Sequence, residues 1–269
     1  MRLIQRLWLT IFRPLTSSYG WPALDMTLPG RRKLHLVGSI HMGTPNMAPL
    51  PAGLLRKLHQ ADALIVEADI RDSASPFTEE PPRAPLQARL DEALWLQTAK
   101  RAQEIGLATE TVDVLPFWQI ALLLQARQAQ HLGLRPEFGI DYQLLEYTQR
   151  ANCPVAELEG AQRQLSLLKT LPDEGFRLLE DTLTHWHTNA RLLQTLMSWW
   201  LNAPPRRPLA ALPVTFSQDL YDTLMTERNR QWHRFLYALP PGYYVVAVGA
   251  LHLYGEGNLP LLLRRGPPI

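Results

Sequence analysis

The chain has 269 residues, 46% hydrophobic and 19% charged, so it can bury the core of one large or two modest domains and is not intrinsically disordered. The net charge is +2 and the arginines are scattered, which gives no basic stripe of the kind that binds nucleic acid. The single cysteine, Cys153, excludes an intrachain disulfide and favours a reducing compartment.

Residues 1–20 form an N-terminal segment with basic residues and a short apolar patch. The patch, 7–12, is shorter than the apolar run of a signal peptide, and no stretch of the chain reaches the roughly 20 apolar residues of a spanning helix. The spacing of its aliphatic residues favours an amphipathic helix. We expect this helix to pack on the protein's own body, with weak peripheral contact to an anionic membrane as the alternative. The chain is therefore expected to be cytoplasmic.

The pattern predicts a strand at 33–40, a helix at 49–61 and a strand at 63–70, which together are typical of a βαβ unit with parallel strands. Prolines in 71–90 indicate a loop. The remaining predicted elements are helices over 86–149 with breaks at Gly106, Pro116 and 133–139, a strand at 154–160, helices over 162–201, a break at 202–208, a helix at 217–239, a strand at 243–250 and a short helix at 259–265.

This order of elements predicts an α/β fold with a mostly parallel central sheet built from βαβ units. Helical insertions at about 86–150 and 162–239 make the middle of the chain helix-rich, and we expect them to form a subdomain or lid. Residues 21–269 are expected to be a single α/β domain.

A Gly-x-x-His motif occurs twice, as VGSIHMG at 37–43 and as VGALHLYG at 248–255, each directly after a run of strand formers. It places His41 and His252 just beyond two predicted strands. In open parallel sheets, ligands bind outside the carboxyl ends of the strands. The glycines before the histidines, Gly38 and Gly249, suit places where the backbone approaches a ligand or a neighbouring strand closely.

Acidic residues end the other two predicted strands. Glu67 and Asp69 lie two apart and are expected to face the same side, and Glu157 and Glu159 repeat that spacing. Two histidines with carboxylates suit zinc, manganese, cobalt or iron. Such an ion would activate water for hydrolysis, and a remaining carboxylate could act as general base. The competing interpretation is that each histidine is a structural residue at a strand end.

Six blocks of sequence occur in the order found in a known family: HLVGSIHMG, ADALIVEAD, FGIDYQLL, PVAELEGAQRQ, LMTERNRQW and VVAVGALHLYGEGNL. On these blocks the chain resembles the TraB/PrgY/GumN family, relatives of the Tiki metalloproteases, from about residue 20 to residue 265. Tiki-like members are described as proteases that depend on a divalent metal. TraB and PrgY are linked instead to shutting down peptide pheromones, by cleavage or by sequestration.

The resemblance implies a set of site residues. The family's histidine motifs match His41 and His252, its strand-end glutamate matches Glu67, its Arg-Asn pair matches Arg228 and Asn229, its Gly-x-Asp matches Gly139 and Asp141, and its Leu-Glu matches Glu159. Many relatives carry signal peptides or membrane anchors, and this chain departs from them there.

We assign His41, His252 and Glu67 to the metal, which we expect to be manganese, cobalt or zinc. Asp69 and Glu159 compete for the roles of ligand and general base. For Arg228, two roles stay open: stabilising the charge of a tetrahedral intermediate, or a structural pair with Asp141 or another acid.

Several other polar residues have simpler explanations. Asp141 begins a predicted helix, where N-capping alone explains it. Glu256 follows His252 in a Gly-flanked turn, and a surface turn is the simpler interpretation. His185 and His187 lie two apart on a predicted helix and do not face one ion. Trp199 and Trp200 are expected to pack in the core.

The sequence therefore supports a metal-dependent hydrolase that acts on a peptide or protein substrate. The alternative is a protein that binds and sequesters a peptide in its helical middle without cleaving it. A third, weaker hypothesis is haem or iron binding, by analogy with distant relatives.

Overall fold

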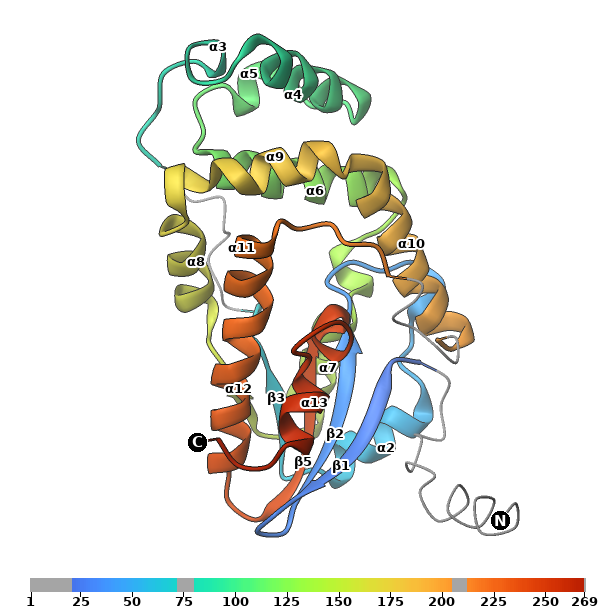
Figure 1. The fold of residues 1–269 in the computed structure, drawn as a ribbon. Coiled ribbons are helices and arrows are strands. Elements are labelled where there is room, and N and C mark those ends of the chain that lie inside the picture. Colours follow the sequence, from blue (N-terminus) through green and yellow to red (C-terminus); the bar gives the residue numbers. More distant parts are fainter. Residues whose placement is uncertain (1–20, 72–79, 205–211, 269) are drawn as a thin grey trace, which may run out of the picture.

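The structure is a computed structural model, and it describes residues 21–71, 80–204 and 212–268. It confirms an α/β fold with a mostly parallel sheet and a large helical part (Figure 1). The segment 1–20, where an amphipathic helix and a membrane contact are expected, lies outside the described residues. None of the helices in the described ranges is long and apolar enough to cross a membrane.

Five strands form one sheet in the order β1-β2-β5-β3-β4. They are β1 Ala23–Leu28, β2 Arg32–Ser39, β3 Ala63–Val66, β4 Val155–Glu157 and β5 Gly242–Gly249. β1 runs antiparallel to β2, and all other neighbouring strands are parallel. The strand that comes last in the chain is therefore the central strand of the sheet.

The predicted βαβ unit, which consists of β2, α2 (Ala52–Gln60) and β3, is present, but its two strands are not neighbours. β5 lies between them, so that Val246 is paired with Leu36 on one side and with Ile65 on the other. Valines fill the middle of β5 and are fully buried. A strand covered on both faces needs such a continuous apolar run, which explains why this segment takes the centre.

β1 has no counterpart among the predicted strands. Its sequence, ALDMTL, does alternate apolar and polar side chains from Leu24 onward, which is the pattern of a half-buried strand. The turn to β2 passes through Gly30 and Arg31, whose φ angles are +78° and +60°. Glycine adopts this left-handed backbone without steric cost, and β1 thereby closes the sheet as an antiparallel edge.

The helices follow the predicted order, with more breaks than expected. The insertion before β4 contains α3 Leu86–Arg89, α4 Glu92–Glu104, α5 Thr109–Val112, α6 Phe117–His131 and α7 Ile140–Ala151. The second insertion contains α8 Ala161–Lys169, α9 Phe176–Thr184, α10 Trp186–Asn202, α11 Gln218–Tyr221, a π-helical turn Asp222–Thr226 and α12 Glu227–Ala238, and α13 Leu259–Arg264 follows β5. Gly175, with φ +82°, lies against Trp118, and it breaks the continuous helix predicted over 162–201.

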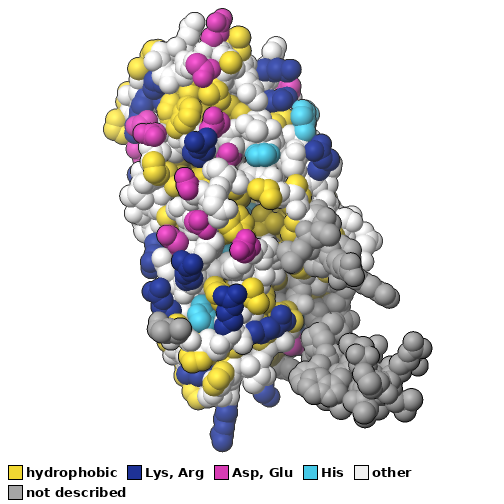
Figure 2. Space-filling view, viewed as in Figure 1, with side chains coloured by type: hydrophobic (Ala, Val, Ile, Leu, Met, Phe, Trp, Pro, Cys, Tyr) yellow, Lys and Arg dark blue, Asp and Glu magenta, His cyan; other side chains and the backbone are white. Residues whose placement is uncertain are grey.

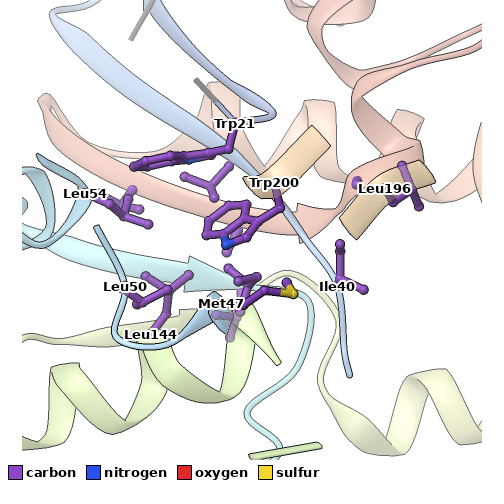
Figure 3. Packing of buried hydrophobic residues seen from close by; sticks show 14 of the residues in the cluster. Trp21, Ile40, Met47, Leu50, Leu54, Leu144, Leu196 and Trp200 are labelled. Atoms are coloured by element: carbon purple, nitrogen blue, oxygen red, sulfur yellow. The ribbon is translucent and has the colours of Figure 1, made fainter. Parts of the chain in front are cut away.

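Helices cover both faces of the sheet. Side chains of β2 alternate between the faces: Val37 packs with α2, α7 and α10, whereas Leu34 and Leu36 pack with α12 and α13. In the first of these cores Trp21 stacks on Trp200 at 5.0 Å between ring centroids, with Met47 and Leu196 nearby (Figure 3). The expectation that Trp199 and Trp200 belong to the core is confirmed.

The remaining helices share a separate core, which joins α3, α4, α5, α6 and α9 through buried leucines and Trp118. In Figure 1 these helices form an arch above the carboxyl ends of the parallel strands. The helix-rich middle of the chain therefore faces the edge of the sheet at which the motif residues lie.

Candidate functional site

The parallel strands bring four motif residues to one edge of the sheet. The register pairs Ser39 with Gly249, Val66 with Ala247, and Val66 with Glu157, so β2, β5, β3 and β4 end near one level. His41, His252, Glu67 and Glu159 follow these four strand ends in the chain. The sheet-edge rule applied to the sequence thus describes their placement correctly.

Gly249 allows close approach between β5 and the residue that follows β3. Its backbone N–H donates to Glu67 Oε1 at 2.6 Å, and a Cβ at this position would lie 3.3 Å from the same oxygen. At Gly38, a Cβ would lie 3.0 Å from Pro22 and 3.1 Å from Ala250. The two motif glycines are therefore explained by close approach to neighbouring segments.

His41 is held by Asp141, which lies in the first turn of α7. The His41 Nδ1 and Asp141 Oδ2 atoms are 2.6 Å apart, and the Asp141 side chain is buried. The expectation that Asp141 caps the helix is wrong: Gly139 is at the N-cap position, and the Asp141 carboxylate contacts the histidine instead. Gly139 allows this because any Cβ there would lie 2.4 Å from the His41 carbonyl oxygen.

The negative charge of Asp141 raises the pKa of His41 above its ordinary value, against the opposing effect of desolvation. The His41 side chain is 68% exposed, so water screens part of this attraction. His41 is therefore the accessible member of the histidine pair. Asp141 favours its protonated form, so the ring must release the Nε2 proton before that nitrogen can bind a metal ion.

His252 has the opposite environment. It is 4% exposed, and its Nδ1 lies 2.7 Å from Asn229 Oδ1. The Asn229 amide nitrogen donates to the Gly257 carbonyl at 3.0 Å, which fixes the amide so that its oxygen accepts from His252 Nδ1–H. Burial lowers the pKa of His252 to about 3. This histidine is neutral and presents the lone pair of Nε2.

Arg228, on α12, joins the two acids of the site. It donates to Glu67 Oε2 at 2.5 Å and, through Nε and a terminal nitrogen, to Glu159 at 2.9 and 3.1 Å. Its remaining terminal nitrogen donates to the Leu224 carbonyl at 3.3 Å and lies 3.4 Å from His252 Nε2. Of the two roles left open by the sequence, the pairing with acids is the one observed, and the acids are Glu67 and Glu159 rather than Asp141.

Glu67 is buried but remains ionised. Desolvation alone would raise its pKa. The positive charge of Arg228, electrostatic interactions with the His252 and His41 rings and the hydrogen bond from the Gly249 N–H outweigh desolvation and lower the pKa to about 2. Its Oε2 also accepts from Gln164 at 3.3 Å. Glu67 is a stable anion at neutral pH.

Asp69 does not join this cluster. β3 ends at Val66, so the alternation that would carry Asp69 to the same side as Glu67 does not continue. The Asp69 carboxylate pairs with Arg71, while its backbone N–H donates to Glu157 Oε1. Glu256 lies in an exposed turn, as expected.

Two contacts in the site have no counterpart in the sequence analysis. Trp232 lies one turn after Arg228 on α12, donates to Glu159 Oε1 at 2.8 Å and packs against His252 with 4.3 Å between ring centroids. Gln164 contacts Glu67 from α8. The four-residue spacing of Arg228 and Trp232 on one helix face is the signal that could have found the tryptophan.

The donor types at this edge fit a divalent cation. Each histidine has its Nδ1 on an oxygen acceptor, which is the arrangement that orients Nε2 as a metal ligand. Glu67 Oε1 accepts one N–H and keeps a second lone pair. Among the described residues, however, no three His, Cys, Asp or Glu side chains are grouped closely enough to hold an ion.

Comparison with known proteins gives consistent results. The model of the TraB/PrgY/gumN family matches residues 26–266. The uncharacterised protein YbaP of Escherichia coli K12 is 58% identical over 248 residues, which cover 92% of this chain and 94% of that protein, and YbaP of Shigella flexneri matches equally well. No solved structure matches the chain.

Proposed function

The chain belongs to the TraB/PrgY/gumN family, and on that premise and the geometry of the sheet edge we propose that it is a hydrolase of peptide bonds that requires a divalent metal ion. The observation that carries the proposal is the pair of Gly-x-x-His histidines, each with Nδ1 fixed by a buried oxygen acceptor, beside the ionised Glu67.

We assign His41, His252 and Glu67 as the residues that would hold the ion, which we expect to be manganese, cobalt or zinc. A bound ion of this kind lowers the pKa of its water to about 7 and polarises a carbonyl. The low pKa of Glu67 supports a role as ligand over a role as general base, because so weak a base takes up a proton poorly near pH 7. The exposed face of His41 gives the substrate access.

Arg228 and Glu159 act in this proposal as positioning residues. The guanidinium is already engaged by two carboxylates and a carbonyl, which leaves little donor capacity for an oxyanion. Glu159 is 3% exposed and accepts from both Arg228 and Trp232, so it is unsuited to be a base. Asp69, engaged by Arg71, is left out of the ligand set.

The first experiment is metal analysis by mass spectrometry on protein purified without chelators. The wild type is compared with the His41→Ala/His252→Ala variant, and His185→Ala/His187→Ala is the matched control, since both of its histidines lie at the start of α10. We expect near-stoichiometric metal in the wild type and in the control, and none in the first variant. Cleavage of a peptide library, with and without EDTA, then tests the activity. Absence of metal in all three proteins after incubation with manganese, cobalt and zinc would rule the proposal out.

A second candidate function is peptide binding without cleavage. It is favoured by one observation: Glu67, Glu159 and Arg228 satisfy one another, and no three-ligand group exists among the residues described. Under this alternative, peptide affinity survives the loss of both histidines and no cleavage is detected with any of the three metals. Peptide affinity that disappears in the double variant would count against it.

A further inference from the structure

A cavity of about 600 Å³ lies on the side of the molecule shown in Figures 1 and 2. Its walls come from α11 and the π-helical turn, the stretch 212–216, the first half of α10, the loop 251–257 and α13. In Figure 1 these elements surround the centre of the view, and Figure 2 shows hydrophobic side chains gathered in a hollow there. The size is within the range of pockets that bind organic ligands.

The interior of the cavity is mostly apolar. Six of its lining side chains are Leu192, Leu212, Val214, Phe216, Met225 and Leu251. Val214 is 79% exposed, the most exposed of the large hydrophobic residues in the described ranges. An apolar side chain on a ligand would remove this surface from water.

Two arginines line the same cavity. Arg230 on α12 and Arg265 after α13 are both exposed, and neither forms a salt bridge with a described residue. The acids in the lining are Asp222, which contacts Gln218 and Thr226, and Glu256 in the exposed turn. A guanidinium pair with open donors suits a carboxylate, which accepts bidentate hydrogen bonds.

One wall of the cavity is formed by the stretch 212–216. The backbone N–H and C=O groups of Leu212, Val214 and Thr215 make no hydrogen bond within the described part of the chain, and Pro213 between them has no N–H. An extended peptide can pair with such groups, whereas a fatty acid, which has the same apolar and anionic ends, cannot.

We propose that this cavity binds the C-terminal end of an apolar peptide, with the terminal side chain in the apolar interior, the terminal carboxylate on Arg230 and Arg265, and the peptide main chain along 212–215. The inference is independent of hydrolysis at the histidines, because no residue of the cavity lining is one of the proposed metal ligands. It adds a second site to the molecule.

The loop 255–257 lines the cavity and also contacts Asn229, the residue that fixes His252. The Gly257 carbonyl accepts from Asn229, the residue that fixes His252 Nδ1, and the Tyr221 hydroxyl donates to the Glu256 carbonyl at 2.8 Å. A ligand that moves the loop 255–257 therefore acts on the position of His252 through two hydrogen bonds. Binding of a ligand in the cavity is thereby coupled to the position of His252 at the sheet edge.

The test is isothermal titration calorimetry with the tetrapeptide acetyl-Ala-Ala-Val-Leu as the free acid and as the C-terminal amide. We expect the wild type to bind the acid about 10- to 100-fold more tightly than the amide, the range for hydrogen bonds to a charged group. Arg230→Gln/Arg265→Gln should abolish this discrimination. The matched control Arg234→Gln, at an exposed arginine on the same helix, should keep it.

The same titration is repeated with the His41→Ala/His252→Ala variant and with laurate. Retained preference for the acid in the double-histidine variant is the expected result and separates this site from the proposed metal centre. Equal affinity for acid and amide, unchanged binding in the double-arginine variant, or binding of laurate with no binding of peptide would each overturn the proposal.

Discussion

At the scale of single residues, the two copies of Gly-x-x-His place identical side chains in opposite environments. His41 is exposed and the negative charge of Asp141 favours its protonated form, while His252 is buried, neutral and held by the uncharged Asn229. The difference comes from the partner on Nδ1 and from burial, neither of which the motif encodes. The repeat therefore specifies where the imidazoles lie, and the helices α7 and α12 determine their charge.

Removal of Arg228 should reveal how strongly it holds the two acids. In the variant Arg228→Gln, Glu67 and Glu159 lose a common cation while remaining buried, and we expect the free energy of unfolding at pH 7 to fall by roughly 3–5 kcal/mol. Urea denaturation measures the loss. The control Arg150→Gln removes an ion pair on the surface of α7, in which the arginine is 79% exposed, and should change stability by less than about 1 kcal/mol.

The loss in free energy of unfolding caused by Arg228→Gln should depend on pH. In the wild type the pKa of Glu67 is lowered to about 2, so its contribution to stability is complete above the ordinary value of 4.5 and is lost as the pH falls toward 2. Without Arg228 the pKa of Glu67 is higher. On acidification the variant therefore loses the stabilising contribution of ionised Glu67 at a higher pH than the wild type does. The gap between the proteins should be largest near neutrality and narrow at low pH, and a gap that widens on acidification would contradict this account.

At the scale of elements, the contact between the His41 loop and the start of α7 depends on Gly43 and Gly139, two positions that leave no room for a side chain. Gly43 exchanges backbone hydrogen bonds with Arg135, and the Ile140 N–H donates to the Ile40 carbonyl at 3.0 Å. Added Cβ atoms at Gly43 and Gly139 would meet backbone carbonyl oxygens at 2.2 and 2.4 Å. These glycines let α7 bring Asp141 to His41.

The variant Gly139→Ala should therefore cost about 2–3 kcal/mol of stability, because its Cβ forces the two segments apart. It should also weaken metal binding by pulling Asp141 away from His41. Gly106→Ala is the control: its Cβ meets open space, and only the φ of +67° imposes a cost, about 1–2 kcal/mol. Denaturation and metal content together separate the two effects, and normal metal content in Gly139→Ala would refute the proposed role of this contact.

A second prediction at this scale concerns the ion cluster that joins β1, β2 and α2. His35 Nδ1 lies 2.7 Å from Asp25, which also pairs with Lys57 at 2.9 Å. Burial lowers the pKa of His35 below 6.5 in the folded protein, although Asp25 opposes the shift. As the pH falls below 6.5 the unfolded chain takes up the proton first, so stability present above pH 6.5 is lost.

We expect the free energy of unfolding to decrease between about pH 7.5 and pH 5.5, and to decrease less in the variant His35→Gln. Urea titrations at both pH values provide the test. His59→Gln changes an exposed histidine on α2 and serves as the control, which should follow the wild type. An equal pH dependence in wild type and His35→Gln would remove His35 from this explanation.

The sequence predicted which segments form strands and helices better than it predicted which strands pair in the sheet. Continuous apolar runs indicated β2, β3 and β5, and the breaks at Gly106, Pro116 and 133–139 are found where glycine and proline predict them. The insertion of β5 between β2 and β3 could not be predicted, because Val246 pairs with residues that lie 246 − 65 = 181 and 246 − 36 = 210 positions earlier, and such distant pairing leaves no local pattern. The expectation that Asp69 faces the same side as Glu67 is wrong for a local reason: the strand ends at Val66, earlier than its apolar run suggested. The expectation that Asp141 caps its helix is wrong, because an aspartate at a helix start can either cap the helix or contact a side chain from another segment, and the sequence does not distinguish the two.

At the scale of the whole molecule, the proposed metal would join the ends of β2, β3 and β5 and so should stabilise the entire sheet. At a free metal concentration 100 times the dissociation constant, the gain is about 2.7 kcal/mol. Thermal melting of the metal-free protein with added manganese, cobalt or zinc should show a higher midpoint, which EDTA reverses. His41→Ala/His252→Ala should show no shift, and an equal shift in that variant would place the metal elsewhere.

The central position of β5 also determines when the sheet can be completed during translation. Chains are made from the N-terminus, and β5 follows both β2 and β3 in the chain, so it leaves the ribosome after both of them. Until then β2 and β3 hold open edges that invite wrong partners. A chain that ends before β5 therefore keeps both edges open and lacks the strand that carries His252 to the sheet edge.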